Sequence, residues 1–310
     1  MHVRALFCCV HSTPVSAPGS ASSVCHTCAY NDPVDSVDQD SRALCAFIRD
    51  HPRLVVLTGA GISADSGIPT YRDRRGVWLH REPIQQQAFL EDENTRRRYW
   101  ARSWFGWPVV RDAIPNPAHY ALAQLEAGGS VQLLITQNID RLHQRAGSRR
   151  VVDLHGRIDR VRCLSCTRVH ARETVQGLLQ ARNRWTYRGP VATRPDGDVD
   201  IPEDVCRRLV LPRCELCQGD LMPDVVFFGG SVPRRRVATC MDSLEQADAL
   251  LCVGSSLQVY SGYRFCRRAQ QLGKPVVLVN PGLTRADDMA RLKLTSPAGP
   301  LLARTAERLC

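Results

Sequence analysis

Short runs of branched apolar residues alternate along this chain with segments of helical periodicity. Each run is too short for a helix and has the composition of a strand buried in a parallel sheet. The expected strands are 54–57, 131–136, 151–154, 225–228, 249–253 and 275–279. Because alternating strands and helices form a parallel sheet covered on both faces, the pattern predicts an α/β fold with a doubly wound, Rossmann-like sheet. Ligands of such a fold bind across the carboxyl ends of the strands.

The segment Leu54 to Arg72 runs from the first expected strand through a glycine-rich turn into a short helix. Such a turn suits a pyrophosphate, because a helix start directs bare backbone N–H groups and partial positive charge at one point. Gly59-x-Gly61-x-x-Ala64 fits the dinucleotide-binding fingerprint. Pro69, however, ends the helix early, and no second strand ending in an acid follows. A hydride-transferring dehydrogenase is therefore disfavoured, and the turn alone leaves a purely structural role open.

Polar residues and glycines directly follow several expected strands, and they form the candidate site. Because the carboxyl ends of parallel strands meet at one edge of the sheet, these residues should gather there. They are Gln137, Asn138, Asp140, His155, Gly254, Ser255, Ser256 and Asn280. Taken singly, His155 suits a structural histidine and Asn138 to Asp140 suit a turn, so only their co-occurrence argues for chemistry.

The pattern also predicts helices with recognisable ends. One is expected over 40–50, with Asp40 as its N-cap. Another lies between Asn116-Pro117, an N-cap followed by proline at the first helical position, and Gly128-Gly129. Residues 78–112 are expected to form a small helical module, and its tryptophans are better explained as the core of that module than as a binding site.

Composition narrows the class of protein. The chain has 310 residues, of which 44% are hydrophobic, and no run approaches the length of a membrane span. The net charge of +10 comes almost wholly from scattered arginines, which favour a solvated surface over a nucleic-acid groove. Residues 1–40 are rich in Ser, Pro and Ala without periodicity, so we expect a disordered extension, in which the lone Cys25-x-x-Cys28 has no partner pair.

Two matched cysteine pairs indicate a metal site. The chain has 14 cysteines, and cysteines within apolar patterns suit a reducing compartment better than a disulfide framework. Two CxxC knuckles together complete a tetrahedral, closed site for a structural Zn²⁺. The predicted ligands are Cys163, Cys166, Cys214 and Cys217. We therefore expect residues of about 157–220 to form a smaller zinc-binding lobe, with a helix near 172–182, inserted in a domain of residues 41–310.

The ordered set TGAGISxxSGIPxYR, TQNIDxLH, LHG, CxxC…CxxC, PDVVFFG, VGSSLQV and LVN resembles the sirtuin family of NAD-dependent protein deacylases. The resemblance extends from about Ser41 to Arg308. The segments 116–119, 195–198 and 259–265 are similar to the class II branch, which includes bacterial members and a mitochondrial one. The resemblance implies that NAD is a consumed co-substrate, that the second substrate is an acylated lysine of a protein or peptide, and that one Zn²⁺ is structural.

The resemblance also implies residue roles. Asn138 and Asp140 match the residues that hold the nicotinamide carboxamide, and His155 matches the general base that activates a ribose hydroxyl. An imidazole suits that task because its unperturbed pKa lies near neutrality. Segments 225–229 and 256–259 match the edges between which a peptide adds as a strand. The implied cofactor contacts are Gly59, Ala60, Gly61, Ile62, Ser63, Asp65, Tyr71, Arg72, Gln137, Asn138, Ile139, Asp140, Gly254, Ser255, Ser256, Asn280, Pro281, Gly282 and Ala298.

Two positions depart from the family pattern and leave the acyl preference open. Gly230 stands where relatives often carry an acid, and Thr70 stands where many carry Asp or Ala. The Tyr-x-x-Arg used by relatives that remove acidic acyl groups is absent after the cofactor loop. Deacetylation is the expected activity. The alternatives are removal of longer or lipoyl-type acyl groups, protein mono-ADP-ribosylation on the same fold, and a non-catalytic NAD-sensing module. We expect a monomer that binds neither membranes nor specific nucleic acids, in a bacterial cytoplasm or, second, a mitochondrial matrix.

Overall fold

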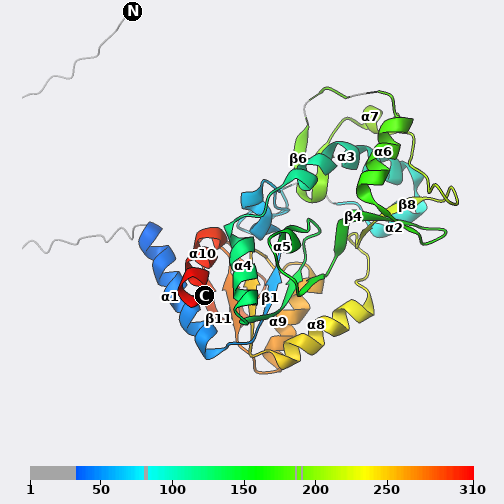
Figure 1. The fold of residues 1–310 in the computed structure, drawn as a ribbon. Coiled ribbons are helices and arrows are strands. Elements are labelled where there is room, and N and C mark those ends of the chain that lie inside the picture. Colours follow the sequence, from blue (N-terminus) through cyan, green and yellow to red (C-terminus); the bar gives the residue numbers. More distant parts are fainter. Residues whose placement is uncertain (1–32, 80–82, 186, 190) are drawn as a thin grey trace, which may run out of the picture. The chain divides into compact units, whose positions relative to one another are not determined.

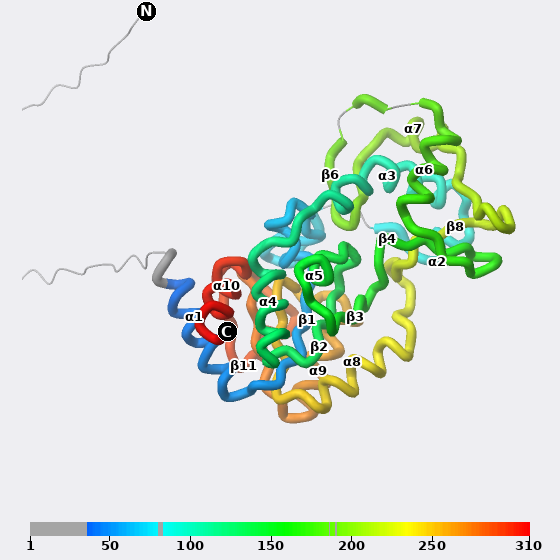
Figure 2. Tube along the Cα trace, in the orientation of Figure 1, coloured from blue at the N-terminus to red at the C-terminus, as the bar shows by residue number. Residues whose placement is uncertain are grey.

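The computed structural model describes residues 33–79, 83–185, 187–189 and 191–310. Cys25-x-x-Cys28 and the rest of 1–32 lie outside the described residues. A six-stranded sheet forms the centre of the larger lobe (Figures 1 and 2). Every strand pair in it is parallel, as the apolar runs predicted. The strand order is β11 (Ala290–Leu294), β10 (Val276–Val279), β9 (Ala249–Val253), β1 (Leu54–Thr58), β2 (Val131–Thr136) and β3 (Val151–Asp153).

Helices cover both faces of the sheet, which is why its central strands are fully buried (Figure 1). Val56 and its neighbours on one face pack against α1 (Pro33–Asp50), α4 (Pro117–Ala127) and α10 (Ala298–Leu309). Val55 and Leu57, which point the other way, pack against α8 (Arg234–Gln246) and α9 (Tyr260–Gln271). The doubly wound prediction is therefore confirmed.

Helix α1 begins earlier than the sequence suggested. It starts at Pro33, so Asp40 lies inside it and is not the N-cap. Residues 33–40 are accordingly helical, and the expected disorder is wrong for them. Their side chains explain the difference, because Oδ2 of Asp40 accepts a 3.2 Å hydrogen bond from the Ser296 amide and Asp38 pairs with Arg42 and Arg308. Helix α4, by contrast, has the predicted Asn116 cap and ends at Gly128.

A second, smaller lobe contains a three-stranded antiparallel sheet in the order β5 (Val169–Ala171), β4 (Gly156–Cys163) and β8 (Leu221–Val225). The expected core strand over 225–228 is wrong. The strand is shifted toward the N-terminus and pairs with β4, because a short apolar run fits either sheet equally well. Residues 226–228 instead form the loop that leaves β8.

Helices and a hairpin complete the smaller lobe. Two tryptophans of α3 (Glu93–Asp112) pack against the cysteine-bearing strand and loop, since Trp100 and Trp104 share one buried cluster with Cys163 and Cys214. The helical module therefore forms one core with the zinc insert. The other elements of this lobe are α2 (Gln86–Glu91), α6 (Arg172–Arg182), α7 (Glu203–Arg207), and the pair β6 (Ala192–Arg194) and β7 (Asp198–Asp200). Helix α5 (Leu142–Arg145) contacts α4 in the larger lobe (Figure 1). Turns of 3₁₀ type lie at Ala60–Ser66, Pro195–Gly197 and Asp287–Met289. Within the described ranges, no helix is long and apolar enough to cross a membrane.

Candidate active site and metal centre

The glycine-rich loop after β1 packs closely against the end of β9. Gly59 donates its amide to Val253 O at 3.1 Å, and Gly61 donates to Gly254 O at 2.8 Å. A Cβ on Gly61 would lie 2.8 Å from that same carbonyl oxygen, closer than real Cβ contacts. Glycine is therefore required because two loops meet at this point. The expectation of bare backbone N–H groups in this loop does not hold for Gly59 and Gly61, since the neighbouring strand end already binds their amides.

A cavity of about 980 Å³ lies at the carboxyl ends of the parallel strands. It collects nearly all the residues that the sequence placed in the cofactor site. Those on its wall are Gly59, Ala60, Gly61, Asp65, Tyr71, Arg72, Gln137, Asn138, Ile139, His155, Gly254, Ser255, Ser256, Asn280, Pro281, Gly282 and Ala298. Ile62, Ser63 and Asp140 are buried behind this wall. The volume and the glycine cradle fit an extended dinucleotide.

Ser63, Asn138 and Asp140 form one buried hydrogen-bonded group. The Asn138 amide nitrogen donates to Gly59 O at 3.1 Å and to Ser63 Oγ at 2.9 Å. Ser63 in turn donates to Asp140 Oδ2 at 2.7 Å, and the Leu142 amide donates to Oδ1 at 2.9 Å. Burial raises the pKa of Asp140, while the bonds from Leu142 and Ser63 act against that rise. The loop after β2 is thus held rigidly against the glycine-rich loop.

His155 follows β3 and has both ring nitrogens engaged. Nδ1 lies 2.9 Å from Gln137 O, and a carbonyl only accepts, so Nδ1 carries the proton. Nε2 is then the basic atom, and the hydroxyl of Ser261 lies 2.7 Å from it. Burial lowers the pKa of His155 to about 4, and Arg236 and Arg264 lower it further, against the bond to Gln137. The imidazole is therefore neutral near pH 7, as a base requires.

The segment after the glycine-rich loop closes one side of the cavity. The guanidinium of Arg72 stacks 3.9 Å from the Trp78 ring centroid and donates to Gly76 O at 2.7 Å. Tyr71 donates its hydroxyl to Asp196, which reaches the cavity from the turn between β6 and β7. Burial raises the pKa of Asp196 to about 7, with a further increase from Asp198.

The far end of the cavity is bordered by the loop after β10. Asn280 donates its side-chain amide to Gly282 O at 3.0 Å, which fixes the turn through Pro281. The Leu283 amide donates to Arg74 O at 2.9 Å, so this turn is bonded to the segment that carries Tyr71 and Arg72. The adenosine-side residues and the closing segment therefore form a continuous wall.

The two departures from the family pattern have defined contacts. Thr70 donates its hydroxyl to Arg72 O at 3.0 Å, and Thr70 lines the cavity. Gly230 donates its amide to Phe227 O at 2.9 Å and closes the turn after β8. Neither residue contributes a group that would replace His155 or Asn138.

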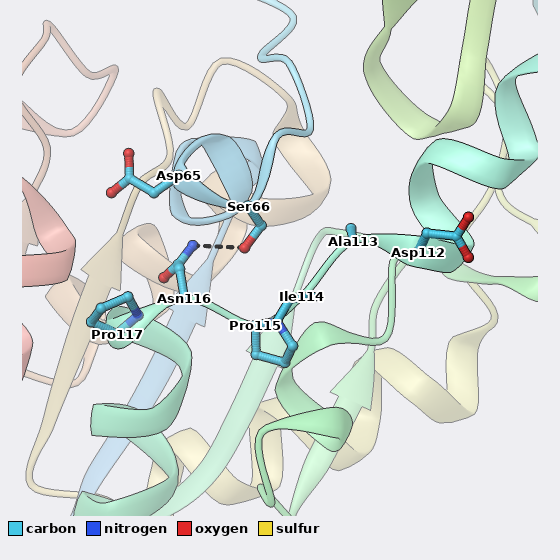
Figure 3. A pocket seen from close by; sticks show the side chains of 8 residues that line it. All are labelled: Asp65, Ser66, Asp112, Ala113, Ile114, Pro115, Asn116 and Pro117. Carbon is cyan, nitrogen blue, oxygen red and sulfur yellow. Dashed lines mark hydrogen bonds between the residues drawn. The ribbon is translucent and has the colours of Figure 1, made fainter.

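A separate shallow hollow of about 480 Å³ lies behind the glycine-rich loop (Figure 3). Asp65, Ser66 and the start of α4 line it. Its central polar group, the side-chain amide of Asn116, already donates to Ser66 Oγ at 2.9 Å and to Ile62 O at 2.8 Å. These two hydrogen bonds of Asn116 connect the start of α4 to the 3₁₀ turn that follows the glycine-rich loop, so the hollow marks a structural contact.

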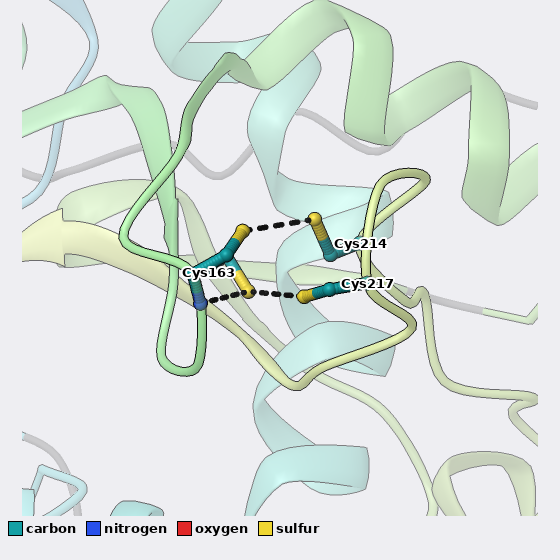
Figure 4. A group of neighbouring side chains, drawn as sticks. Cys163, Cys214 and Cys217 are labelled. Atoms are coloured by element: carbon teal, nitrogen blue, oxygen red, sulfur yellow. Dashed lines mark hydrogen bonds between the residues drawn. The ribbon is translucent and has the colours of Figure 1, made fainter.

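The four predicted zinc ligands converge in the smaller lobe (Figure 4). Sγ of Cys163 lies 3.5 Å from that of Cys217, and Sγ of Cys166 lies 3.7 Å from that of Cys214. All four sulfur atoms lie within 4.8 Å of one another. Zn–S bonds of about 2.3 Å at tetrahedral angles place sulfurs roughly 3.8 Å apart, so this donor set fits Zn²⁺ without an open position.

Sequence reasoning missed two groups that contact the site. Ser261 belongs to a segment noted only for its class II character, and no motif marks it as a partner of His155. Asp196 likewise stood in a noted segment without a role. The sequence did contain a signal for Asp196, because an aspartate between Pro195 and Gly197 favours a tight turn. The structure has this turn, in which Asp196 has a left-handed φ of 59°. The partner of Ser261 is His155, which is distant in sequence, so this contact could be found only from the folded structure.

Comparison with known proteins identifies the family. The Sir2 family model matches residues 59–261. NAD-dependent protein deacetylase 2 of Bradyrhizobium diazoefficiens is 51% identical, over 85% of this chain and 96% of its own. NAD-dependent protein deacylase Sirt4 of Drosophila melanogaster is 43% identical, over 86% of this chain and 87% of its own. A solved structure described as "Sir2-p53 peptide-NAD+" superposes with a TM-score of 0.70 at 29% identity and covers 86% of this chain and 97% of that one. The chain belongs to the Sir2 family.

Proposed function

We propose that this protein is an NAD-dependent protein lysine deacylase, with acetyl-lysine as its default substrate. It transfers the acyl group from lysine to ADP-ribose and releases nicotinamide and the acyl ester of ADP-ribose. The observation that carries the proposal is His155, which lines the same cavity as the glycine-rich loop and Asn138 and whose Nε2 is the basic atom of a neutral imidazole. Bacterial relatives that are 49% to 51% identical are named NAD-dependent protein deacetylases, in support of this activity.

Different residues of the cavity have different roles in binding and catalysis. Asn138 and Asp140 orient the carboxamide of nicotinamide, and Ser63 keeps both side chains in place. Arg72 and Tyr71 close the cavity and exclude water from the ribose. His155 takes the proton from the ribose hydroxyl that receives the acyl group, which requires the neutral imidazole seen here. NAD supplies the electrophilic ribose carbon, so no hydride acceptor is needed.

The substrate peptide lies between residues 225–229 and 256–259. Both segments line the cavity next to His155. An added strand would bond mainly through backbone groups, so many sequences around the acylated lysine would be accepted. The solved structure of a relative with a p53 peptide supports a peptide as the second substrate.

The zinc ion has a structural role in this proposal. The cysteine cluster is packed with Trp100 and Trp104 of α3, and none of the four cysteines lines the cavity. We further propose that the protein acts as a monomer in a bacterial cytoplasm. The bacterial origin of two relatives that are 49% and 51% identical supports only the bacterial part of this proposal.

The test is mass spectrometry of a panel of acyl-lysine peptides incubated with the protein, with and without NAD. Loss of an acyl group matched by acyl-ADP-ribose supports the proposal, and the ranking of peptides gives the preferred chain. His155→Ala is the control and should stop acyl transfer while NAD binding persists. NAD consumption with label on protein and no acyl-ADP-ribose would contradict deacylation and indicate ADP-ribosyl transfer.

A further inference from the structure

The basic nitrogen of His155 does not face the cavity alone. Ser261 Oγ lies 2.7 Å from Nε2, and both residues line the cavity. Because Nδ1 carries the ring proton, Ser261 must donate its hydroxyl proton to Nε2. The atom that has to accept the ribose proton is thus already hydrogen-bonded to a hydroxyl.

The backbone that presents Ser261 is held in an unfavourable conformation. Leu257, four residues earlier, has φ 56° although it is not glycine, and its side chain is buried among the residues that pack under α9. The backbone amide of Leu257 is held in place because it donates a hydrogen bond to Ser255 Oγ at 3.2 Å. A left-handed backbone is unfavourable for a residue other than glycine, and such strain persists where the surrounding structure fixes it. This fixed backbone therefore holds the start of α9, which carries Ser261, in one orientation.

Gln137 holds His155 and Ser261 in register. Its carbonyl binds Nδ1 of His155, while its side-chain amide donates to Ser255 Oγ at 2.9 Å, on the loop that leads to Ser261. A Cβ on Gly262, the residue after Ser261, would meet the Gln137 side chain at 2.5 Å, so the two segments touch here. One residue thus fixes both members of the pair.

We propose that Ser261 is a hydroxyl relay between the substrate and His155. This inference rests on the proposed deacylase function. The ribose hydroxyl gives its proton to Ser261 Oγ as Ser261 gives its own proton to Nε2. The ribose oxygen then bonds to the acyl carbon, and as that bond forms the electron pair of the double bond between the acyl carbon and the lysine nitrogen moves onto the nitrogen. One O–H bond breaks on the ribose, one is exchanged on serine, and one N–H bond forms on the imidazole.

Ser261 also serves His155 after the transfer. Burial, and with it Arg236 and Arg264, disfavours the imidazolium, so the positive charge that the relay leaves on His155 is costly. After the transfer, Nε2 becomes a donor, and the serine oxygen 2.7 Å away is there to accept from it. A methyl group in place of the hydroxyl would leave that buried N–H without a partner.

The experiment separates nicotinamide release from acyl transfer. Ser261→Ala should lower the deacylation kcat about tenfold or more, while exchange of labelled nicotinamide into NAD stays within about twofold of the wild type, because exchange precedes the step that needs the base. Ser261→Thr keeps the hydroxyl and should retain most of kcat. Ser243→Ala on α8, outside the cavity wall, is the matched control for a serine-to-alanine change.

Three results would overturn the relay. Ser261→Ala with wild-type or higher kcat would show that the serine only covers the base. A loss of exchange equal to the loss of deacylation would show a structural effect. If His155→Ala leaves a measurable residual rate of acyl transfer, a lower rate in the double variant with Ser261→Ala would show that the serine does not act through His155. If the wild type itself exchanges nicotinamide but removes no acyl group, the proposed deacylase function fails and the relay, which rests on it, fails with it.

Discussion

Nε2 of His143 lies 2.9 Å from Oγ1 of Thr58, and both side chains are buried. Thr58 donates in turn to Thr136 Oγ1 at 2.9 Å, and Thr136 Oγ1 accepts the Asn138 amide at 3.1 Å. A chain of hydrogen bonds therefore runs from α5, across the ends of β1 and β2, to the residue proposed to orient nicotinamide. Neither His143 nor Thr58 lines the cavity.

Thr58→Val should weaken NAD binding. The change removes the hydroxyl that connects His143 to Thr136 and costs about 1 kcal/mol, or roughly fivefold in Kd. Thr58→Ser keeps the hydroxyl and should bind NAD as the wild type does. Calorimetric titration with NAD measures both variants. Equal affinity of the valine and serine variants would show that the chain of bonds does not position Asn138.

Acid should destabilise the protein through two buried histidines. Burial lowers the pKa of His119 to about 4. Burial also lowers the pKa of His143 well below its usual value, and the neighbouring His119 lowers it further. The unfolded chain binds protons at about pH 6.5 and the folded one does not, so stability is full above pH 6.5 and falls as the pH drops below it. At pH 5 the loss is about 2 kcal/mol for each histidine.

Urea unfolding at pH 7.5 and pH 5 tests this linkage. His119→Asn retains an acceptor for the Asn116 amide, which now donates to Nδ1 at 3.3 Å. The variant should therefore lose about half of the pH dependence contributed by the pair. A slope identical to that of the wild type would show that His119 does not resist protonation in the folded state.

The activity of His155 should tolerate mild acid. With its pKa lowered to about 4 by burial, the imidazole stays neutral from pH 8 down to about pH 5.5. An exposed imidazole would lose half of its basic form near pH 6.5. Removing a neighbouring positive charge by Arg264→Gln should raise this pKa and move the acidic limb of the rate profile upward. An acidic limb centred near pH 6.5 in a protein that is still folded would contradict the burial argument.

The sequence predicted the sheet and the cavity edge because both rest on local pattern. Branched apolar runs such as 131–136 form strands in any buried sheet, and polar residues after them must meet at one edge. The run 225–228 failed because four apolar residues do not say which of two sheets they join. The strand Ala290–Leu294 was missed, since Arg291 and Lys293 at an exposed edge break its apolar pattern.

The site was less accessible to sequence reasoning where partners come from distant segments. His155 and Asn138 could be named from their motifs, but Ser261 and His143 act through contacts that depend on how α9 and α5 pack. The engagement of two amides of the glycine-rich loop was also missed. Gly59 and Gly61 donate to the last residue of β9 and to the residue after it, about 190 positions later, and no local pattern reports that pairing.

Loss of one zinc ligand should unfold the smaller lobe. Cys214→Ser removes a thiolate from a site whose sulfur atoms lie within 4.8 Å of one another, next to Trp104. Bound zinc should fall well below one per chain, and tryptophan emission should shift to the red as α3 loses its packing. Cys310→Ser, at an exposed position, is the control and should change neither quantity. A folded Cys214→Ser protein with unchanged emission would exclude a structural metal.

Asp196→Asn should stabilise the protein, and increasingly so as the pH rises. Burial raises the folded pKa of Asp196 from 3.8 to about 7, so the folded state holds a proton that the unfolded state has released. Stability contributed by this group is therefore greatest below pH 3.8 and is lost as the pH rises to about 7. Asparagine keeps an acceptor for the Tyr71 hydroxyl and has no charge to bury.

The gain of Asp196→Asn over the wild type should consequently grow between pH 4 and pH 7 and stay constant above that, at about 2 to 4 kcal/mol. Thermal unfolding at pH 5 and pH 8 measures it. Asp204→Asn, on the exposed surface of α7, controls for the loss of one negative charge from the smaller lobe. A gain that is the same at both pH values would mean that Asp196 is ionised in the folded protein, and that the hydroxyl of Tyr71 with its surroundings solvates a carboxylate there.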